Sequence, residues 1–357
     1  MKKLIFSVAL LSAALSASAE EHPLWMRYPA ISPDGTTIAF AYKGDLYSVS
    51  VNGGEARQLT THAAFDSHPV WSPDSKKIAF QSNREGSLDI FVIDAKGGAP
   101  TRLTTNSGSE TPIAFADNDH VLYSASLQPT AQSIIFGDNT FPQVYKVSTK
   151  GGRPELFSTL TMENISIAKN GDILYHDKKG YEDPWRKHQK SPIARDIWLK
   201  SNGKFAKQTT FAGEDRSPVW TSDEKSFFYL SEQDGTFNIY RRSLNSSSDK
   251  QITHHKGNPV RFLTASSADL LCYGYDGEIY TVKEGGEPQK VNISITTDND
   301  APSLVRQIKS WGATEISVSP DAKEVAFVMH GDVYVTSVEY TTTKRITDTP
   351  QQERDLS

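Results

Sequence analysis

The strongest constraint on the fold is an internal repeat with a period of about forty residues. The segment Pro29-Ala30-Ile31-Ser32-Pro33-Asp34-Gly35 returns as Pro69-Val70-Trp71-Ser72-Pro73-Asp74-Ser75. In both copies the same four motifs follow in the same order. They are an Ile-Ala-Phe run, an Asp-Leu or Asp-Ile pair with an aromatic residue, a Gly-Gly pair and a Leu-Thr pair. Short runs of β-branched and aromatic residues alternate with turn residues, so each copy is predicted to form a four-stranded antiparallel sheet.

Four weaker copies follow, and they open at Thr111, Asn164, Ser217 and Asn258. Six copies predict an all-β fold, namely a six-bladed β-propeller of four-stranded antiparallel blades over residues 20–293. Each blade has four strands of its own. We therefore expect the ring to close through apolar packing between the first and sixth blades, without a swapped strand.

A seventh copy, with Glu315-Ile316-Ser317-Val318-Ser319-Pro320-Asp321, follows a polar linker over residues 294–312. Because this copy returns to the strong form of the repeat, residues 313–357 are predicted to be the first blade of a second propeller in a longer protein. Such a blade would expose an apolar face when alone. The alternative is a seventh blade in a single ring.

The first nineteen residues have the pattern of a signal peptide. Lys2-Lys3 precede the apolar run from Leu4 to Leu15, and Ala17-Ser18-Ala19 form a cleavage site. The mature chain is then expected to begin at Glu20 and to be exported, to the periplasm or the medium, with no membrane span after cleavage. A retained anchor is the alternative.

Charge and motif content exclude several function classes. The chain carries 38 Lys and Arg against 43 Asp and Glu, a net charge of −5, which disfavours nucleic acid as a partner. The sequence has no nucleophile elbow, zinc helix, phosphate loop or dinucleotide turn, so we assign no catalytic residue and expect no metal and no cofactor. The single cysteine, Cys272, follows two leucines and is interpreted as a core thiol rather than a nucleophile.

The best candidate binding element is an insertion in the fourth blade, residues 177–190. Here Tyr181 and Trp185 are interleaved with Arg186, Lys187 and further basic residues. Such a loop could contact another domain, another subunit or a peptide, since Trp and Arg are common interface anchors. The alternative is a loop packed on its own blade. A longer loop in the third blade, from Ser126 to Phe141, is a weaker candidate of the same kind.

Two histidine segments are weaker candidates. Asp66-Ser67-His68-Pro69 places a carboxylate and an imidazole at the start of an inner strand, which allows a catalytic or metal role. Structural hydrogen bonding between blades is the preferred interpretation, because no second ligand pair recurs at metal spacing. His254-His255 is interpreted as a solvated turn.

The repeat pattern resembles that of three propeller groups: the periplasmic Tol-Pal translocation protein, prolyl oligopeptidases and the tricorn protease family. Six copies, a linker and a fresh copy are similar to the tricorn layout, and the insertion at residues 181–188 resembles exported bacterial members. This resemblance implies a serine peptidase acting on oligopeptides, with its catalytic residues outside this chain. It further implies that the propeller acts as a gate for peptide substrates or products, with other domains of the same chain and a homo-oligomer as partners.

Two function classes remain open at this level. The first is the amino-terminal, non-catalytic region of a tricorn-like peptidase. The second is an exported binding propeller resembling the Tol-Pal component, which works through protein contacts; that family carries an additional α/β domain before its propeller. A prolyl-oligopeptidase type of propeller would require a hydrolase domain downstream.

Overall fold

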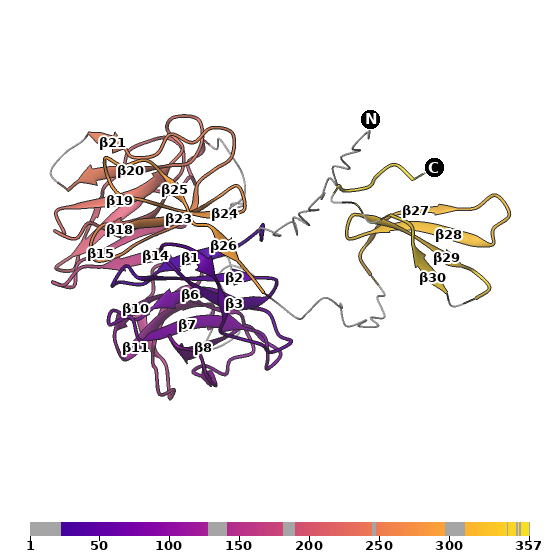
Figure 1. The fold of residues 1–357 in the computed structure, drawn as a ribbon, viewed down its shortest axis with the longest axis horizontal. Helices are drawn as coiled ribbons and strands as arrows, with labels where there is room; N and C mark the ends of the chain where they lie inside the picture. Colours follow the sequence, from indigo (N-terminus) through magenta and orange to yellow (C-terminus); the bar gives the residue numbers. More distant parts are fainter. Residues whose placement is uncertain are drawn as a thin grey trace, which may run out of the picture. The chain divides into compact units, whose positions relative to one another are not determined.

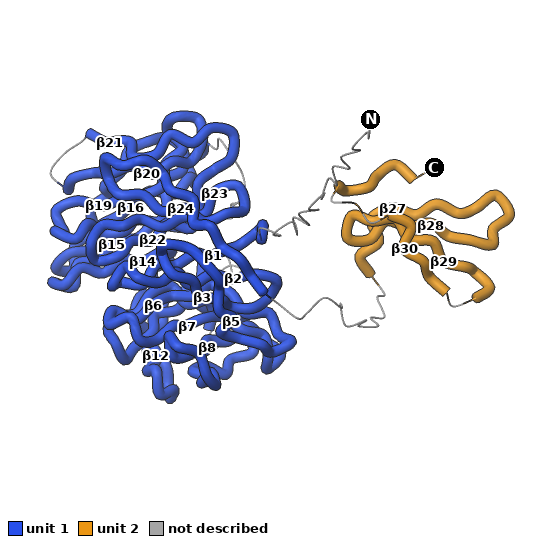
Figure 2. Tube along the Cα trace, in the orientation of Figure 1, with its two compact units in different colours: residues 1–296 blue, residues 297–357 orange. Residues whose placement is uncertain are grey.

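The computed structural model describes residues 23–127, 141–180, 190–244, 248–296, 311–340, 342–347, 349 and 351–356. The chain divides into two compact units, residues 1–296 and residues 297–357 (Figure 2). Every regular element of the described residues is a β-strand, which confirms the all-β prediction. In the part of the chain that the structure describes, we find no helical segment with the length and hydropathy of a membrane span.

The described residues of unit 1 form six four-stranded antiparallel sheets, each built from consecutive parts of the chain (Figure 1). The first three are β1 (Arg27–Ile31), β2 (Thr37–Tyr42), β3 (Asp45–Ser50) and β5 (Arg57–Gln58); β6 (Asp66–Trp71), β7 (Lys77–Ser82), β8 (Asp89–Asp94) and β9 (Thr101–Arg102); and β10 (Glu110–Asp117), β11 (His120–Ala125), β12 (Gln143–Ser148) and β13 (Glu155–Ser158).

The second three sheets have the same strand order. They are β14 (Met162–Ile167), β15 (Ile173–Asp177), β16 (Ile197–Ser201) and β17 (Lys204–Lys207); β18 (Asp215–Trp220), β19 (Ser226–Ser231), β20 (Asn238–Ser243) and β21 (Asp249–Gln251); and β22 (Arg261–Ala265), β23 (Leu271–Tyr275), β24 (Glu278–Val282) and β25 (Gln289–Lys290). The predicted four-strand unit is therefore confirmed.

The Ser-Pro-Asp motif of the repeat forms the turn between the first and second strands of a sheet. In the first sheet the Ser32 hydroxyl donates to the Asp34 carboxylate, and that carboxylate accepts the backbone N–H of Thr36 at 3.0 Å. The Ser32 oxygen also accepts the N–H of Thr37 at 3.0 Å. Gly35 follows with φ = +74°, a conformation that glycine adopts without a Cβ penalty. The motif is thus required by turn geometry.

The Leu-Thr pair of the repeat stabilises the third strand. The Thr60 hydroxyl accepts the backbone N–H of Leu46 at 2.9 Å, and the Thr104 hydroxyl accepts that of Ile90 at the same distance. Thr209 and Thr253 make the equivalent bonds to later third strands. A threonine at this position therefore satisfies a buried donor that the short fourth strand leaves unpaired.

The six sheets form a ring through their first strands. β1 contacts β6, β6 contacts β10, β10 contacts β14, β14 contacts β18, β18 contacts β22, and β22 contacts β1. Apolar side chains fill the space between neighbouring sheets; Leu46 and Phe80, for example, come from adjacent sheets and are fully buried in one cluster. This arrangement is that of a β-propeller.

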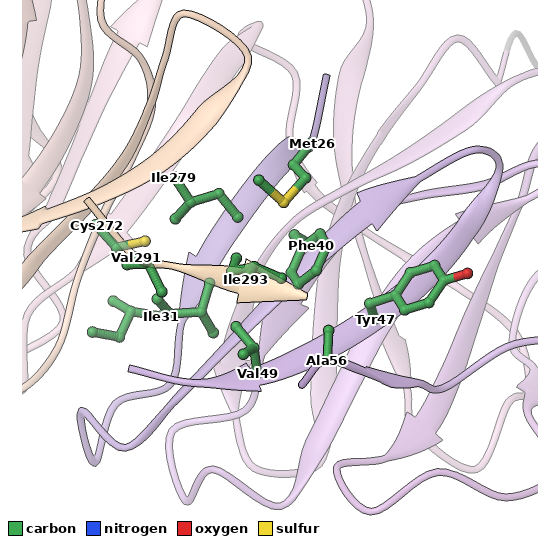
Figure 3. Packing of buried hydrophobic residues seen from close by; sticks show 11 residues of the cluster. Met26, Ile31, Phe40, Tyr47, Val49, Ala56, Cys272, Ile279, Val291 and Ile293 are labelled. Carbon is green, nitrogen blue, oxygen red and sulfur yellow. The ribbon is translucent and has the colours of Figure 1, made fainter. Parts of the chain in front are cut away.

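The seam between the first and sixth sheets is closed by apolar packing, as predicted. Figure 3 shows the cluster, in which Met26, Phe40 and Val49 of the first sheet pack with Ile279 and Cys272 of the sixth. The prediction was nevertheless incomplete, because a short strand after the sixth sheet also crosses the seam. β26 (Ile293–Ser294) pairs in parallel with β4 (Gly54–Glu55), a segment between β3 and β5.

Unit 2 is one four-stranded antiparallel sheet of the same order: β27 (Ala313–Val318), β28 (Glu324–Met329), β29 (Asp332–Ser337) and β30 (Thr343–Arg345). Its Ser319–Asp321 turn repeats the bonding of the first sheet. Val318, which precedes this turn, is 57% exposed, whereas Ile31 at the equivalent position of β1 is 3% exposed. The sheet therefore has an uncovered apolar face, as expected for a single blade.

Candidate functional site: the central cavity of the propeller

The six first strands surround a cavity of about 680 Å³, which we call the central cavity. Residues of all six sheets line it, so it lies on the axis of the ring. Proline or branched aliphatic side chains cover much of the wall. They include Pro29, Pro69, Ile113, Ile165, Pro218 and Leu263.

Each of these six strands is interrupted where it lines the cavity. The pairing register with the second strand shifts near the start of every first strand, which marks a β-bulge, and it shifts a second time near the end of β10. In five strands a residue of the bulge has a left-handed backbone conformation although it is not glycine. These are Tyr28 (φ +53°), His68 (+54°), Asn164 (+46°), Ser217 (+50°) and Phe262 (+59°).

Left-handed backbone is costly for residues such as Tyr, His and Phe. Five such residues at equivalent positions around one cavity therefore concentrate strain at the axis. Strain of this kind persists where the surrounding structure enforces it, and it is frequent at functional sites. The bulges turn the side chains of these positions toward the cavity, whose lining includes all five residues.

One side of the cavity is aromatic. The ring centroids of Tyr28 and His68 are 3.8 Å apart, and those of Tyr28 and Phe262 are 4.7 Å apart. These three side chains, the aromatic arc, come from the sixth, first and second sheets. Burial lowers the pKa of His68 to about 4. The aromatic arc is therefore uncharged at neutral pH.

The opposite side of the cavity is charged. Glu163 accepts hydrogen bonds from His176 Nε2 at 3.1 Å and from Arg195 Nε at 3.0 Å. The buried Glu214 lies between two guanidiniums: its Oε1 is 3.5 Å from Arg195 Nη1 and its Oε2 is 2.8 Å from Arg216 Nε. Lys178 Nζ also lies 3.9 Å from Glu163. We call these five residues the charged cluster: Glu163, Lys178, Arg195, Glu214 and Arg216.

His176 links this cluster to the neighbouring bulge. Its Nδ1 accepts the backbone N–H of Ser217 at 3.1 Å, so Nε2 carries the proton that is donated to Glu163. This is the neutral tautomer, and burial lowers the pKa of His176 in agreement with it. Burial alone would raise the pKa of Glu163, but the hydrogen bond from His176 and the positive charge of Arg195 outweigh it and lower the pKa. Glu163 is therefore an anion held by fixed donors.

The predicted contact residues Tyr181, Trp185, Arg186 and Lys187 lie outside the described residues, as does most of the loop from Ser126 to Phe141. Their role stays a prediction. Lys178, a basic residue of the same insertion that the structure does describe, lines the central cavity.

The structure separates the residues of the Asp66–His68 segment. Asp66 is fully buried and pairs with Arg84 Nη2 at 2.8 Å, within its own sheet. His68 lines the cavity, and its ring packs against that of Tyr28 at an interplanar angle of 31°. The segment was expected to form hydrogen bonds between blades. The backbone of Asp66 does so, because its N–H donates to the Gly44 carbonyl of the first blade at 2.7 Å.

The interpretation of His255 as a solvated residue was wrong. His255 stacks on Tyr275 with a centroid distance of 3.9 Å, and its Nε2 lies 2.9 Å from the Tyr273 hydroxyl. Burial lowers its pKa. His254 is exposed, as predicted.

Cys272 is fully buried in the seam cluster, and burial raises the pKa of its thiol, as expected for a core residue. Within the described ranges, no group of three or more His, Cys, Asp or Glu side chains could hold a metal ion.

Sequence reasoning missed most residues of the central cavity, although His68 and Lys178 belong to segments that it singled out. A usable signal was present in four copies, since aligning the repeats places Tyr28, His68, Asn164 and Ser217 at one column. In the sixth sheet the structure puts Phe262 at this position, four residues after Asn258, where the sixth copy was expected to open. The residues at this column differ between copies, so they do not stand out in the shared repeat pattern.

A ring of four-stranded sheets around an axial cavity defines a β-propeller protein. The chain belongs to the tricorn protease N-terminal β-propeller domain family, whose model matches residues 23–288. The resemblance seen in the repeat pattern is thereby confirmed.

Among curated relatives, tricorn protease homolog 1 of Streptomyces coelicolor is 25% identical over 322 residues, which cover 87% of this chain and 29% of that protein. Tricorn protease of Thermoplasma acidophilum is 24% identical over 339 residues, covering 89% of this chain and 30% of that protein. The crystal structure of the tricorn protease superposes with a TM-score of 0.69 at 20% identity, over 92% of this chain and 32% of that chain. The chain thus spans less than a third of the length of these relatives.

Proposed function

We propose that this chain is the non-catalytic, amino-terminal propeller region of a longer tricorn-like serine peptidase that degrades oligopeptides. The observation that carries the proposal is the central cavity in a propeller of this family, lined by residues of all six sheets. A cavity of about 680 Å³ is far smaller than a folded domain, so we expect it to accept only part of an extended peptide. The propeller would therefore select unfolded peptides, as substrates or products, before or after cleavage elsewhere.

The single sheet of unit 2 fits the same proposal. It repeats the turn and strand pattern of unit 1, and its Val318 and Ile316 are 57% and 67% exposed. A sheet with such a face is stabilised by a neighbouring blade. We propose that it opens a second propeller.

The signal-peptide pattern supports a proposal about where the protein acts. The peptidase would act after export, in the periplasm or the medium, on peptides present there. Fractionation of cells, with sequencing of the mature amino terminus, tests this; Glu20 as the first residue supports export, and an intact Met1 in the cytoplasm contradicts it.

The decisive experiment uses the complete gene product and unfolded peptides of graded length. We expect cleavage that a serine-directed acylating inhibitor abolishes, and no cleavage by residues 20–357 alone. Removal of residues 20–295 from the complete protein should change the length preference. A complete product that cleaves nothing would refute the peptidase and direct attention to protein partners of a binding propeller.

A further inference from the structure

Positive charge exceeds negative charge at the central cavity. Four cationic side chains, Lys178, Arg195, Arg216 and Arg261, line it, and among its lining residues Glu163 is the one carboxylate that the structure describes. Glu214, just behind the wall, balances one further cation. Among the described residues that line the cavity, cationic side chains therefore outnumber carboxylates.

The cations are held in place. The side chains of Arg195, Arg216 and Lys178 are 6%, 12% and 16% exposed, so they are largely removed from water. Arg216 is also fixed over the ring of Phe237, at 5.3 Å from its centroid. A fixed guanidinium in a confined, partly desolvated space attracts an anion more strongly than an exposed one, because less solvent screens it.

The order of side chains along the cavity wall is a second observation. Arg216 and Arg261 occupy the same bulge position in the adjacent fifth and sixth sheets. The next residue after Arg261 is Phe262, which belongs to the aromatic arc with Tyr28 and His68. A basic segment of the wall is thus followed directly by an aromatic segment.

We propose that the central cavity is a selective binding site for peptide segments in which an acidic side chain lies next to an aromatic or large apolar one. This rests on the proposed function and specifies the peptides that the propeller accepts. The carboxylate is bound between Arg216 and Arg261, and the apolar side chain packs on the aromatic arc. Lysine-rich segments are rejected by the like charge of the wall.

Arg261 and Phe262 provide the test because both line the central cavity and Phe262 belongs to the aromatic arc. Arg261→Gln removes one cation of the wall. Phe262→Leu removes one aromatic ring while keeping an apolar side chain at the left-handed position. Lys76→Gln is the matched control for charge, since Lys76 lies on an outer turn with a side chain that is 77% exposed.

The probe is a fluorescent, C-terminally amidated and N-terminally acetylated ten-residue peptide, whose only charge is one Glu before Phe. The comparison peptides replace Glu by Gln or Lys, replace Phe by Ala, or carry Gln with a free C-terminal carboxylate. Binding to the mature chain is measured by fluorescence anisotropy at low and moderate salt, and circular dichroism verifies that each variant is folded.

We expect the Glu-Phe peptide to bind about tenfold more tightly than the Gln-Phe peptide, since one charged hydrogen bond is lost. Arg261→Gln should reduce this preference to about twofold, Phe262→Leu should weaken the Phe peptide but not the Ala peptide, and Lys76→Gln should change neither. Equal affinity for the Glu and Gln peptides, or an equal loss in Lys76→Gln, overturns the proposal. Tighter binding of the free C-terminal carboxylate than of the internal Glu also overturns it, in favour of a terminus-binding site.

The outcome is separate from that of the peptidase assay. If the complete protein cleaves peptides but the Glu and Gln peptides bind equally, the proposed function stands and the acidic selectivity fails. If the selectivity is found but nothing is cleaved, the propeller is a binding module for acidic segments and the peptidase proposal fails.

Discussion

Ile31 and Thr264 are 233 residues apart in the sequence, yet the Ile31 backbone N–H donates to the Thr264 hydroxyl at 3.1 Å. The bond joins the first strand of the first sheet to the first strand of the sixth. Nearby, the Met26 N–H donates to the Gly277 carbonyl at 3.1 Å and the Ser267 N–H to the Pro33 carbonyl at 2.8 Å. The ring is therefore closed by hydrogen bonds at its inner edge as well as by the apolar cluster around Ile293 (Figure 3).

Thr264→Val tests this inner bond. Valine has nearly the same shape, so the main loss is the acceptor for the Ile31 N–H, and we expect a destabilisation of about 1 kcal/mol in urea unfolding. Thr264→Ser keeps the hydroxyl and should cost less. Faster amide exchange of Ile31 in Thr264→Val alone is expected; an unchanged exchange rate would show that the bond does not hold the seam.

Gly53→Ala tests the outer closure by β4 and β26. Here a Cβ would overlap the carbonyl oxygen of Asn292, the same oxygen that accepts the Gly54 N–H at 2.9 Å. Gly54→Ala is the matched control, because Gly54 also has a positive φ, of +114°, but its Cβ would meet no atom within 4 Å.

Both variants incur the backbone penalty of a positive φ, and only Gly53→Ala also disrupts the strand pair. We expect Gly53→Ala to be less stable than Gly54→Ala by about 1 kcal/mol or more. Thermal unfolding of the two proteins side by side measures the difference. Equal melting temperatures would mean that the β4–β26 pair adds nothing to closure.

The sequence predicted those parts of the fold that local chemistry determines in every copy. Ser32, Asp34 and Gly35 specify a turn wherever they occur together, and Thr60 pairs with the strand fourteen residues before it, so these features repeat visibly. β4 and β26 could not be predicted in this way. They are two residues long, and they pair only because ring closure brings together segments more than 230 residues apart.

The candidate site was harder to predict for a related reason. Left-handed residues such as Tyr28 and Phe262 have no favourable local propensity for that conformation, and tertiary packing at the axis imposes it. His255 was misjudged because its partners, Tyr273 and Tyr275, belong to the next repeat. The polarity of His255 suggested that it is exposed to solvent, whereas the neighbouring sheet places aromatic rings against it.

His176→Phe tests the support of the charged cluster. The imidazole accepts the Ser217 N–H and donates to Glu163, and it is 3% exposed, so phenylalanine would leave the buried Ser217 N–H and the half-buried Glu163 carboxylate without these partners. A destabilisation of about 2 kcal/mol is expected. His255→Phe replaces a more exposed histidine with one hydrogen-bonded hydroxyl partner and should cost less than half as much; a reversed order would contradict the assigned role of His176.

The pH dependence of stability provides the last prediction. Burial raises the pKa of Asp215 to about 7, the charges of Asp196 and Asp249 add to the increase, and the side chains of Ser231 and Thr209 oppose it. Because the pKa is higher in the folded state than in the unfolded state, folding is favoured by protonation. This contribution is fully present below about pH 4 and is lost as the pH rises toward 7.

We therefore expect the free energy of unfolding to be lower at pH 8 than at pH 5, by about 1.4 kcal/mol for each pH unit between pH 5 and the raised pKa. Burial also raises the pKa of Glu110 to about 7, which adds a second contribution of the same sign. Asp215→Asn cannot ionise, so its stability should fall less between pH 5 and pH 8 than that of the unaltered chain. Urea unfolding at both pH values measures this, and parallel curves for the two proteins would show that Asp215 is ionised in the fold at pH 5.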